Sequence, residues 1–497
     1  MRKNNLKNII YTFLGQIIVL GLALIVPRLV LTSYGSDTNG LISTVTQIMS
    51  YLALLEAGIG QATRNELYQY NHGDTYDKSN ISLVMSVSRK SYRDITKVYA
   101  VLVILLSFIL PVVINTDLNY LTVLLVVLIE GASGVVSFYF VQNWMNLLAV
   151  DGKQYINSNI DLIFKVLIYL VKIGIALSGI SIVFMEIGFF IATVIKLLLY
   201  RLYINKYYKW IDYQKDTEGR KLKDRKAYIV SEVSWTVFSS TDLIVLSIFC
   251  STKSSSVYSI YSMIFLTINK LLDAVNTSIK INLGQSYHNN EEEYRKTHDL
   301  FNSGFIGIIS ALMIVAYYLC LPFVSLYTDG INDIDYIDNT LPMGFCLVVL
   351  FSWYRMIAEH LNGVAGYAKP LSKISLIEAA TNLCLSVLLV NKFGIKGVLY
   401  ATVIALPIKI IYCNWLADKV ILKRSIFNTV KILGINAIIF FGLALVKDKM
   451  PLTINSYVDI LKYAVIFTLI SSAIFLTGNI IANRNVLTFL KGFGKKD

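Results

Sequence analysis

The sequence predicts an all-α integral membrane protein with about fourteen transmembrane helices. Of its 497 residues, 55% are hydrophobic and only 15% are charged, against roughly 25% charged residues in soluble domains. Apolar blocks long enough to cross a bilayer as helices recur from end to end, and the chain contains only 7 prolines. A soluble chain of this length would divide into about three domains joined by polar linkers. The pattern therefore indicates one integral membrane unit.

The first six spans precede a long basic segment. The first span follows MRKNNLK; it is too long for a signal-peptide core and lacks a small-residue cleavage site, so we expect it to remain in the protein. The fifth and sixth are separated only at LSGIS, and the fourth could continue into the cytoplasm. Windows of about 20 apolar residues place these spans at 8–31, 40–62, 94–115, 119–149, 159–180 and 182–204.

Eight more spans follow the basic segment. Each is an apolar block of similar length bounded by polar or charged residues. They lie at 228–250, 256–283, 300–326, 341–364, 371–390, 396–418, 427–446 and 456–482.

Loop charges orient the chain. An even number of spans puts both termini on one side, and cytoplasmic loops hold most of the Lys and Arg. With the N-terminus inside, the largest inner segment is the basic RLYINKYYKWIDYQKDTEGRKLKDRK at 201–226. The largest outer segment, TDGINDIDYIDNT at 328–340, has four aspartates and no basic residue. We expect a multi-pass protein of a bacterial cytoplasmic (inner) membrane with both termini cytoplasmic.

Several classes of function are disfavoured. The net charge of +13 comes mainly from short loops between apolar spans, which fits a positive-inside bias better than nucleic-acid binding. The 5 cysteines and 4 histidines show no disulfide or metal-ligand spacing. The sequence contains no Walker-type phosphate loop, nucleophile elbow or HExxH motif. We expect no enzyme, no cofactor and no metal site.

Charged residues lie along single faces of three predicted helices. Positions seven apart on a helix differ by only about 20° in direction, so residues at this spacing share a face. An unpaired charge in hydrocarbon costs at least about 2.5 kcal/mol, so these faces should turn away from lipid. They carry Asp161, Lys165 and Lys172 in the fifth span, Lys270 and Asp273 in the eighth, and Arg355 and Glu359 in the tenth.

Two interpretations of these charges remain open. In one, neighbours neutralise each other between packed helices, as the pairs Asp161–Lys165, Lys270–Asp273 and Arg355–Glu359. In the other, the charges line a water-filled cavity. Arg28 supports the cavity because it follows Pro27 deep in the first span and has no acidic residue one turn away.

The stretch LLEAGIGQATRNELY at 54–68 carries charges of both signs. Gly58 and Gly60 allow close backbone approach or a bend. Arg64 stands at the cytoplasmic mouth of the span, where it either faces the cavity or anchors the inner edge. Four acidic residues are candidates for coupling to H⁺ or Na⁺, for charge balance, or for a structural role: Glu56, Glu130, Asp273 and Glu359.

A weak internal repeat relates the first pair of spans to the seventh and eighth. PRLVLTSYG, GLISTVTQIMSYLALLEAG and GQATRNELYQY in the first pair correspond to TDLIVLSIF, SVYSIYSMIFLTINKLLDA and LGQSYHNN in the second. With LLEAGIGQATRNELY, STDLIVLS and VYSIYSM, this arrangement resembles the polysaccharide (O-antigen and capsule repeat-unit, Wzx-like) flippase family of the multidrug/oligosaccharidyl-lipid/polysaccharide (MOP) superfamily. More distantly, the chain resembles the lipid II flippase.

The resemblance implies two six-helix bundles around a central cavity, with two additional C-terminal helices. It also implies that basic residues of the first, second and eighth spans meet a lipid diphosphate; by position these are Arg28, Arg64 and Lys270. We add Lys165, Lys172 and Arg355 as candidate substrate-binding residues. The expected domains are an N-terminal bundle at 1–204, a basic cytoplasmic linker at 205–227, a C-terminal bundle at 228–420, and two further helices with a basic tail at 421–497.

The expected function is export of an undecaprenyl-diphosphate-linked oligosaccharide repeat unit to the outer leaflet by alternating access. Arg and Lys would bind the diphosphate, and the prenyl tail would stay in lipid. The expected partners are this lipid-linked substrate, membrane lipids, H⁺ or Na⁺ as a coupling ion, and glycan polymerases; we expect no nucleic acid. The alternatives are a cation or drug antiporter of the MATE type, a polysaccharide polymerase or ligase, and a non-transporting scaffold of a glycan-synthesis complex.

Overall fold

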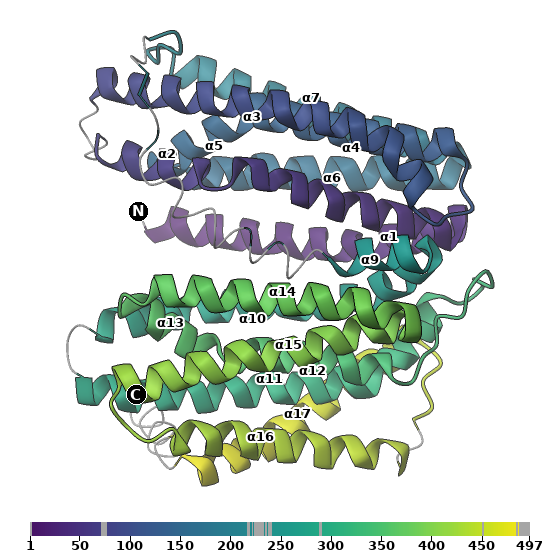
Figure 1. Cartoon of the computed structure of the whole chain (residues 1–497), viewed down its shortest axis with the longest axis vertical. Coiled ribbons are helices and arrows are strands. Elements are labelled where there is room, and N and C mark those ends of the chain that lie inside the picture. Colours follow the sequence, from purple (N-terminus) through teal and green to yellow (C-terminus); the bar gives the residue numbers. More distant parts are fainter. Residues whose placement is uncertain are drawn as a thin grey trace. The chain divides into compact units, whose positions relative to one another are not determined.

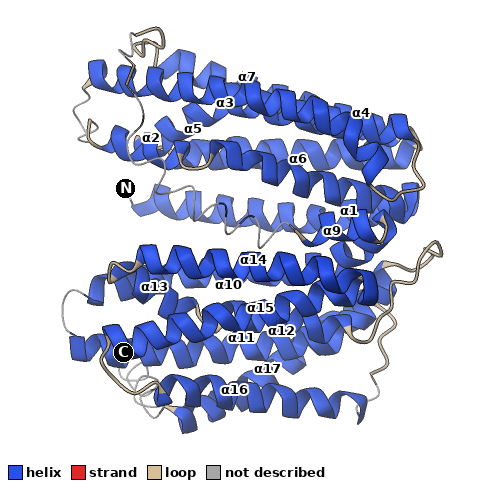
Figure 2. Ribbon diagram, in the orientation of Figure 1, coloured by secondary structure: helices blue, strands red, loops and turns tan. Residues whose placement is uncertain are grey.

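The computed structural model of the chain is helical throughout the part that it describes (Figures 1 and 2). Close backbone contacts divide the chain into two compact units, Met1–Ser256 and Val257–Asp497. The described residues are 2–70, 77–215, 219–220, 222, 233, 236, 241–287, 291–449, 452–483 and 486. Side chains are described for these except at 2–18, 20, 274, 277–279, 281–282, 284–286, 291–293 and 448.

The N-terminal unit is built from long helices with three local breaks. Its elements are α1 (Arg2–Leu52), the 3₁₀ turn η1 (Ala53–Glu56), α2 (Ile59–Tyr68), α3 (Lys78–Val113), α4 (Tyr120–Val136), the π-helical turn η2 (Ser137–Val141), α5 (Gln142–Val150), α6 (Gln154–Ser178), α7 (Ile182–Tyr207), α9 (Asp242–Phe249) and the start of α10 (Thr252–Tyr287).

Glycines break the helices of the first two predicted spans. Gly35 has φ 81° and ψ 176°, a backbone conformation that favours glycine, and it divides α1 into the two predicted spans. Gly58, at φ 75°, separates η1 from α2, and the axis bends by 43° between them. The bend that we predicted for the stretch at 54–68 is therefore present.

The C-terminal unit repeats this pattern of long helices with short breaks. It contains the rest of α10, then α11 (Glu291–Tyr327), α12 (Leu341–Trp353), α13 (Met356–Val364), α14 (Ala368–Phe393), α15 (Ile395–Trp415), the π-helical turn η3 (Leu416–Ile421), α16 (Phe427–Val446), the 3₁₀ turn η4 (Lys447–Lys449) and α17 (Tyr457–Ala482).

The observed helices confirm the predicted fold class and span order. The fourth span continues through α4, η2 and α5 without a loop. At the predicted LSGIS break, α6 ends before Gly179 and α7 begins after Ser181. Most of the predicted span 228–250 lies outside the described residues, which include its last helix, α9. Among the described residues, nine helices, or ten if the bent α1–α2 pair counts as one span, meet a strict test of length and hydropathy. The grouping of spans as six, six and two stays a prediction.

Large apolar side chains project outward from these helices. Val112, Ile438 and Leu445 are 76%, 73% and 79% exposed. Soluble monomers rarely expose apolar surface on this scale, whereas a bilayer covers it without cost. The exposed faces therefore agree with the transmembrane assignment.

Candidate functional site

A hollow of about 320 Å³, lined by apolar and polar side chains, lies inside the N-terminal unit. Glycines let the helices approach on its wall: a Cβ on Gly134 of α4 would lie 2.1 Å from the hydroxyl of Tyr99 on α3. The polar side chains that line the hollow come from α1, α3, α4 and α7; they include Thr46, Ser50, Tyr99, Glu130, Thr193 and Lys196. The hollow therefore brings groups of both charges to one place inside the membrane-spanning region.

Glu130 and Glu186 form a carboxylate pair beside this hollow. Thr46 Oγ1 donates to Glu130 Oε1 at 2.9 Å. The second oxygen, Glu130 Oε2, is buried without a hydrogen-bond partner among the described residues, and so is Oε1 of Glu186, a residue that is only 1% exposed. The two carboxylates interact with each other, and Lys172 attracts both. Two acids face one base in this group.

Further charged groups surround the pair. Asp161 Oδ2 lies 2.8 Å from Lys165 Nζ, and Asp161 Oδ1 lies 3.2 Å from Lys196 Nζ. The Lys165–Asp161 pair is therefore present, with Lys196 as a second partner. Glu56 in η1 acts electrostatically on Tyr99, as Glu130 does. Around the hollow, the acids Glu56, Glu130, Asp161 and Glu186 thus lie near the bases Lys165, Lys172 and Lys196.

The predicted residues of the first two spans lie at separate points along α1 and α2. Arg28 is half-buried in the first part of α1. Arg64 is also half-buried and donates from Nη1 to Asn146 Oδ1 at 2.7 Å and from Nη2 to Gln61 Oε1 at 2.8 Å. Neutral groups therefore hold its guanidinium in place near the middle of α2.

In the C-terminal unit, Arg355 lies at the break between α12 and α13 and is only 4% exposed. Its guanidinium bonds the carboxylate of Glu378 on α14, and its Nε lies 3.4 Å from Glu359 Oε2. Lys409 Nζ of α15 lies 2.7 Å from the other Glu359 oxygen. Two acids and two bases thus form a balanced buried group, in which the predicted Arg355–Glu359 pair is present.

Lys270 and Asp273 contrast with this group. Both are exposed on α10. Within the described part of the chain, the Lys270 side chain makes no hydrogen bond or ion pair, so the expected Lys270–Asp273 pair is not formed there. The roles that we predicted for these site residues stay predictions.

Sequence reasoning did not single out Glu186 and Glu378. Lys196 and Lys409 are recognisable as bases within the predicted spans, but their partners come from other helices, which spacing along the chain does not reveal. Glu186 carried a usable signal. It is an acidic residue within the sixth span with no basic residue one turn away.

No protein-family model matches the chain, and no curated protein matches it in sequence. The structure of the chain, by contrast, is similar to several solved structures. "Lipid II flippase MurJ, inward closed conformation" matches with a TM-score of 0.72 and 16% identity over 95% of this chain and 100% of that chain. An inward-facing "multidrug resistance MATE family transporter of the MOP superfamily" matches with a TM-score of 0.65 and 10% identity, over 80% of this chain and 94% of that one.

A third structure, a MOP superfamily transporter from Pyrococcus furiosus whose description reports a "reverse polarity of binding pocket", matches with a TM-score of 0.58 and 12% identity over 84% of this chain and 95% of that chain. Each likeness extends over most of both chains while identity stays low, so it concerns the path of the backbone. The chain has the fold of the MOP superfamily transporters.

Proposed function

We propose that the chain is a flippase that moves an undecaprenyl-diphosphate-linked oligosaccharide repeat unit from the cytoplasmic to the outer leaflet of a bacterial cytoplasmic membrane, with both termini in the cytoplasm. The similarity in fold to a lipid II flippase supports this class of transport. The observation that carries the proposal is Lys270, an exposed lysine in the middle of a long helix without a described partner.

The depth of Lys270 argues for an anionic ligand. It lies eighteen positions after the start of α10 at Thr252, about 27 Å along a helix with a 1.5 Å rise per residue. That distance is close to the thickness of the hydrocarbon core, so Lys270 lies in the cytoplasmic part of the predicted span 256–283. An amine in lipid is costly, by about 2.5 kcal/mol or more at the centre of a span, whereas an amine that faces water or a phosphate is not.

The other basic candidates support the same substrate to different degrees. Arg28 and Arg64 are half-buried, so a phosphate reaches them without unfolding of their helices. Lys165 and Lys172 lie on α6, and Lys165 is 42% exposed. Arg355 is engaged by two carboxylates, so contact with a substrate would require that buried group to rearrange.

A coupling ion has a candidate site in the Glu130–Glu186 pair. Two buried carboxylates that repel each other inside the membrane are stabilised when one of them takes up a cation. A proton suits the two unpartnered oxygens better than Na⁺, because a metal ion needs several oxygen ligands, and the described residues contain no group of three or more acidic, histidine or cysteine ligands. Glu359 is already neutralised by Lys409 and Arg355, which makes it a weaker coupling candidate than Glu130. Glu56 and Asp273 remain candidates for charge balance.

The experiment measures transfer of a labelled undecaprenyl-diphosphate oligosaccharide across proteoliposomes. Hydrogen bonds to charged groups contribute about 1.5–3 kcal/mol, so Lys270→Ala should slow transfer by about 10- to 100-fold, and Lys270→Arg should keep most of it. Lys462→Ala is the matched control, because Lys462 is a 67% exposed lysine near the start of α17 whose ion pair, among the described residues, is with nearby Asp459. Wild-type rates in Lys270→Ala would refute the role of Lys270.

Two alternatives make different predictions in the same vesicles. A MATE-like antiporter, which the carboxylate pair would also suit, would export an organic cation and leave the lipid in place. A non-transporting scaffold would keep glycan export intact in cells when Arg28 and Lys270 are both replaced by alanine. Association with glycan polymerases is a further expectation, tested by co-purification from cells that make the glycan.

A further inference from the structure

One face of α3 changes from apolar to basic toward the predicted cytoplasmic end of the helix. Residues three, four, seven or eight positions apart share a face of a helix. In the predicted span this face carries Val101 and Phe108, which are 57% and 56% exposed and so face the surrounding lipid. Toward the start of α3 the same face carries Lys97, Arg93 and Lys90, all of them exposed. These three bases therefore point to the perimeter of the protein rather than to its interior.

The bases of this stretch outnumber its acids. Residues 89–97, RKSYRDITK, contain four bases and one acid. Arg93 Nε and Lys97 Nζ each lie 3.9 Å from Asp94 Oδ1, at the outer limit for an ion pair. Within the described part of the chain, Lys90 makes no hydrogen bond or ion pair. The stretch therefore keeps a positive charge that the described residues do not neutralise.

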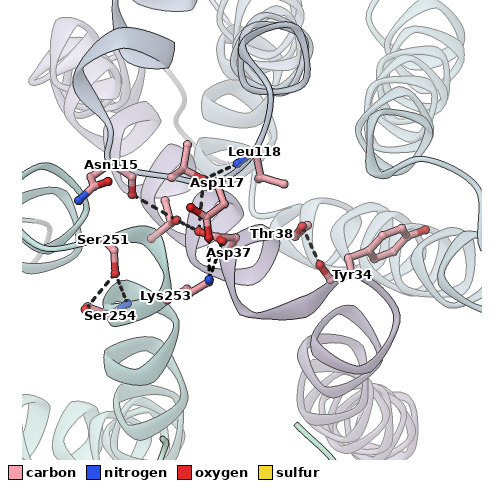
Figure 3. Close-up of polar contacts among 11 residues, drawn as sticks. Tyr34, Asp37, Thr38, Asn115, Asp117, Leu118, Ser251, Lys253 and Ser254 are labelled. Carbon is pink, nitrogen blue, oxygen red and sulfur yellow. Dashed lines mark hydrogen bonds and ion pairs between the residues drawn. The ribbon is translucent and has the colours of Figure 1, made fainter. Parts of the chain in front are cut away.

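A base at the predicted outer end of the same unit is, by contrast, neutralised within the chain (Figure 3). Lys253 Nζ lies 2.7 Å from Asp117 Oδ2, in the loop after α3, and 3.5 Å from Asp37 Oδ2. Two acids of the protein thus surround that one base. The basic stretch at the cytoplasmic end of α3 instead has room for an anion from outside the chain.

A strap formed by residues 208–215, directly after α7, covers the first turns of α3. Ser86 Oγ donates to the carbonyl of Asp212 in the strap at 3.1 Å, and Lys215 Nζ donates to the carbonyl of Ser79 at 3.0 Å. Seven residues separate Ser79 from Ser86, and seven more separate Ser86 from the central base of the stretch, so the strap lies on the side of α3 that carries the bases. The bases are therefore placed between the strap and the lipid-facing part of the helix.

The strap also orients Arg89, the fourth base of the stretch. The guanidinium carbon of Arg89 lies 5.1 Å from the centre of the Tyr213 ring, and Trp144 Nε1 holds that ring by donating to the Tyr213 hydroxyl at 3.1 Å. Among the described residues, no carboxylate pairs with Arg89. A guanidinium stacked on an aromatic face directs its N–H groups sideways, where they match the oxygens of a phosphate. Arg89 is therefore arranged to bind an anion.

The depth of the basic stretch matches the phosphate level of a bilayer. The predicted span begins at residue 94, so residues 89–97 extend across its cytoplasmic end over about 12 Å of helix. The headgroup layer on each side of a bilayer is roughly 5–8 Å thick, and the long stems of Lys and Arg allow their charges to reach it. Four or more bases at the cytoplasmic end of a transmembrane helix are typical of sites for anionic lipids.

We propose that Arg89, Lys90, Arg93 and Lys97 form a binding site for the phosphate of an anionic phospholipid of the inner leaflet, such as phosphatidylglycerol, whose acyl chains lie along Val101. We call these four residues the α3 basic site. A phospholipid fits better than the transported lipid, because the site faces the perimeter and the surrounding leaflet supplies phospholipid continuously. The inference goes beyond the proposed function and does not depend on it, since it requires only that α3 crosses a membrane.

Fluorescence quenching by brominated lipids tests the site in the full-length protein. A bimane label is attached at Val101→Cys, after Cys250 and Cys384 have been replaced by alanine, because the other three cysteines are buried. The protein is placed in phosphatidylcholine vesicles in which a small, fixed fraction of the lipid is brominated phosphatidylglycerol or brominated phosphatidylcholine. Each base near a membrane surface contributes about fivefold in affinity, or about 1 kcal/mol, so phosphatidylglycerol should be preferred at this position by at least about tenfold.

Three controls locate the effect at the α3 basic site. Replacement of its four residues by glutamine should reduce the preference to within about twofold of unity, whereas exchange of each Lys for Arg and each Arg for Lys should keep it. The same label at Val112→Cys, which is 76% exposed near the other end of α3, should show no preference, and its unchanged quenching in the glutamine variant shows that the variant is folded and inserted.

Equal quenching by the two lipids at Val101→Cys, or a preference that survives loss of the four bases, would overturn the inference. Undecaprenyl diphosphate provides the test of the other anionic lipid. If it relieved the quenching by phosphatidylglycerol at a far lower fraction than phosphatidylglycerol itself requires, the site would be an entrance for the transported lipid, which would also overturn the inference. The measurement involves no transport, so absence of lipid transfer would refute the proposed function and leave the α3 basic site standing.

Discussion

Replacing Arg355 with methionine should destabilise the protein strongly at neutral pH and weakly at pH 5. Arg355 and its partner Glu378 both have side chains that are 4% exposed, and Lys409 already neutralises Glu359 at 2.7 Å. Loss of Arg355 therefore leaves Glu378 as the buried charge without a compensating partner in contact. Removing one partner of a buried pair costs about 3–5 kcal/mol.

Protonation of the Glu378 carboxyl, which has lost its partner Arg355, limits this cost. Neutralising a carboxyl of ordinary pKa, about 4.3, costs roughly 1.36 kcal/mol per pH unit above that value, or about 3.7 kcal/mol at pH 7 and about 1 kcal/mol at pH 5. We expect Arg355→Met to lower the free energy of unfolding by about 3–4 kcal/mol at pH 7 and by much less at pH 5. The loss should be largely recovered in the double variant Arg355→Met with Glu378→Gln.

The assay is reversible unfolding in mixed micelles of a mild detergent and dodecyl sulfate, followed by circular dichroism. Lys97→Met is the control, because Lys97 is 71% exposed and lies 3.9 Å from the exposed Asp94, so its loss should cost less than about 0.5 kcal/mol. A loss below about 1 kcal/mol at pH 7, or one that does not shrink at pH 5, would refute the reasoning. A stable double variant that no longer transports lipid would support the predicted contact of Arg355 with substrate.

Two further substitutions test the packing and the predicted outer-face charges. Gly40→Ala should slow lipid transfer or lower the unfolding temperature, because the added Cβ would lie 1.7 Å from the Thr252 carbonyl oxygen. Gly21→Ala is the control, because a Cβ there meets nothing within 4 Å. A Gly40→Ala variant with unchanged transfer rate and unfolding temperature would contradict the close approach. Partial burial would raise the pKa of the Asp338 carboxyl, but the hydrogen bonds from Thr340 and the ion pair with Lys396 lower it. The ionised carboxyl therefore stabilises the folded protein above about pH 4, and this contribution is lost as the pH falls further. Asp338→Asn should therefore flatten the loss of stability between pH 5 and pH 3, and an unchanged slope would contradict the assignment.

Hydropathy and glycine positions predicted most of the fold. Apolar length located the helices because each span must satisfy its own backbone hydrogen bonds in lipid. The sequence placed a break at LSGIS and allowed a bend near Gly58, and the structure has glycine at positive φ at both places, Gly179 (67°) and Gly58 (75°). The Gly35 break was represented as the loop between the first two spans. These features depend on residues that are close in sequence, so the sequence alone can predict them.

The charged partners could be predicted only where they were local. Asp161 and Lys165 are four residues apart on one helix, and their pair was anticipated. The Arg355–Glu378 pair joins two helices, and Thr252 and Asp37 are separated by 215 positions. Helical periodicity says which residues share a face but not which faces meet, so the Arg355–Glu378 and Asp37–Thr252 contacts required the structure.

The direction of charge movement distinguishes the proposed flippase from a cation antiporter. Export of a diphosphate with roughly two negative charges in a cell that is negative inside is favoured by about 4–5 kcal/mol per 100 mV, and import of one proton adds about 2.3 kcal/mol. An antiporter that exchanges one organic cation for one proton would move no net charge. In proteoliposomes, an imposed potential should therefore accelerate lipid transfer, and an opposite one should slow it.

The carboxylate pair separates the two contributions. If Glu130 and Glu186 carry the proton, Glu186→Gln should abolish the dependence of transfer on a pH gradient while the dependence on the potential remains. Ser50→Ala, which alters the lining of the same hollow without changing its charge, should retain both dependences. A Na⁺ gradient that drives transfer in place of a pH gradient would contradict the proton assignment. Transfer indifferent to both the potential and the pH gradient would reject coupled export altogether, because the Glu130–Glu186 pair would then have no part in moving the lipid.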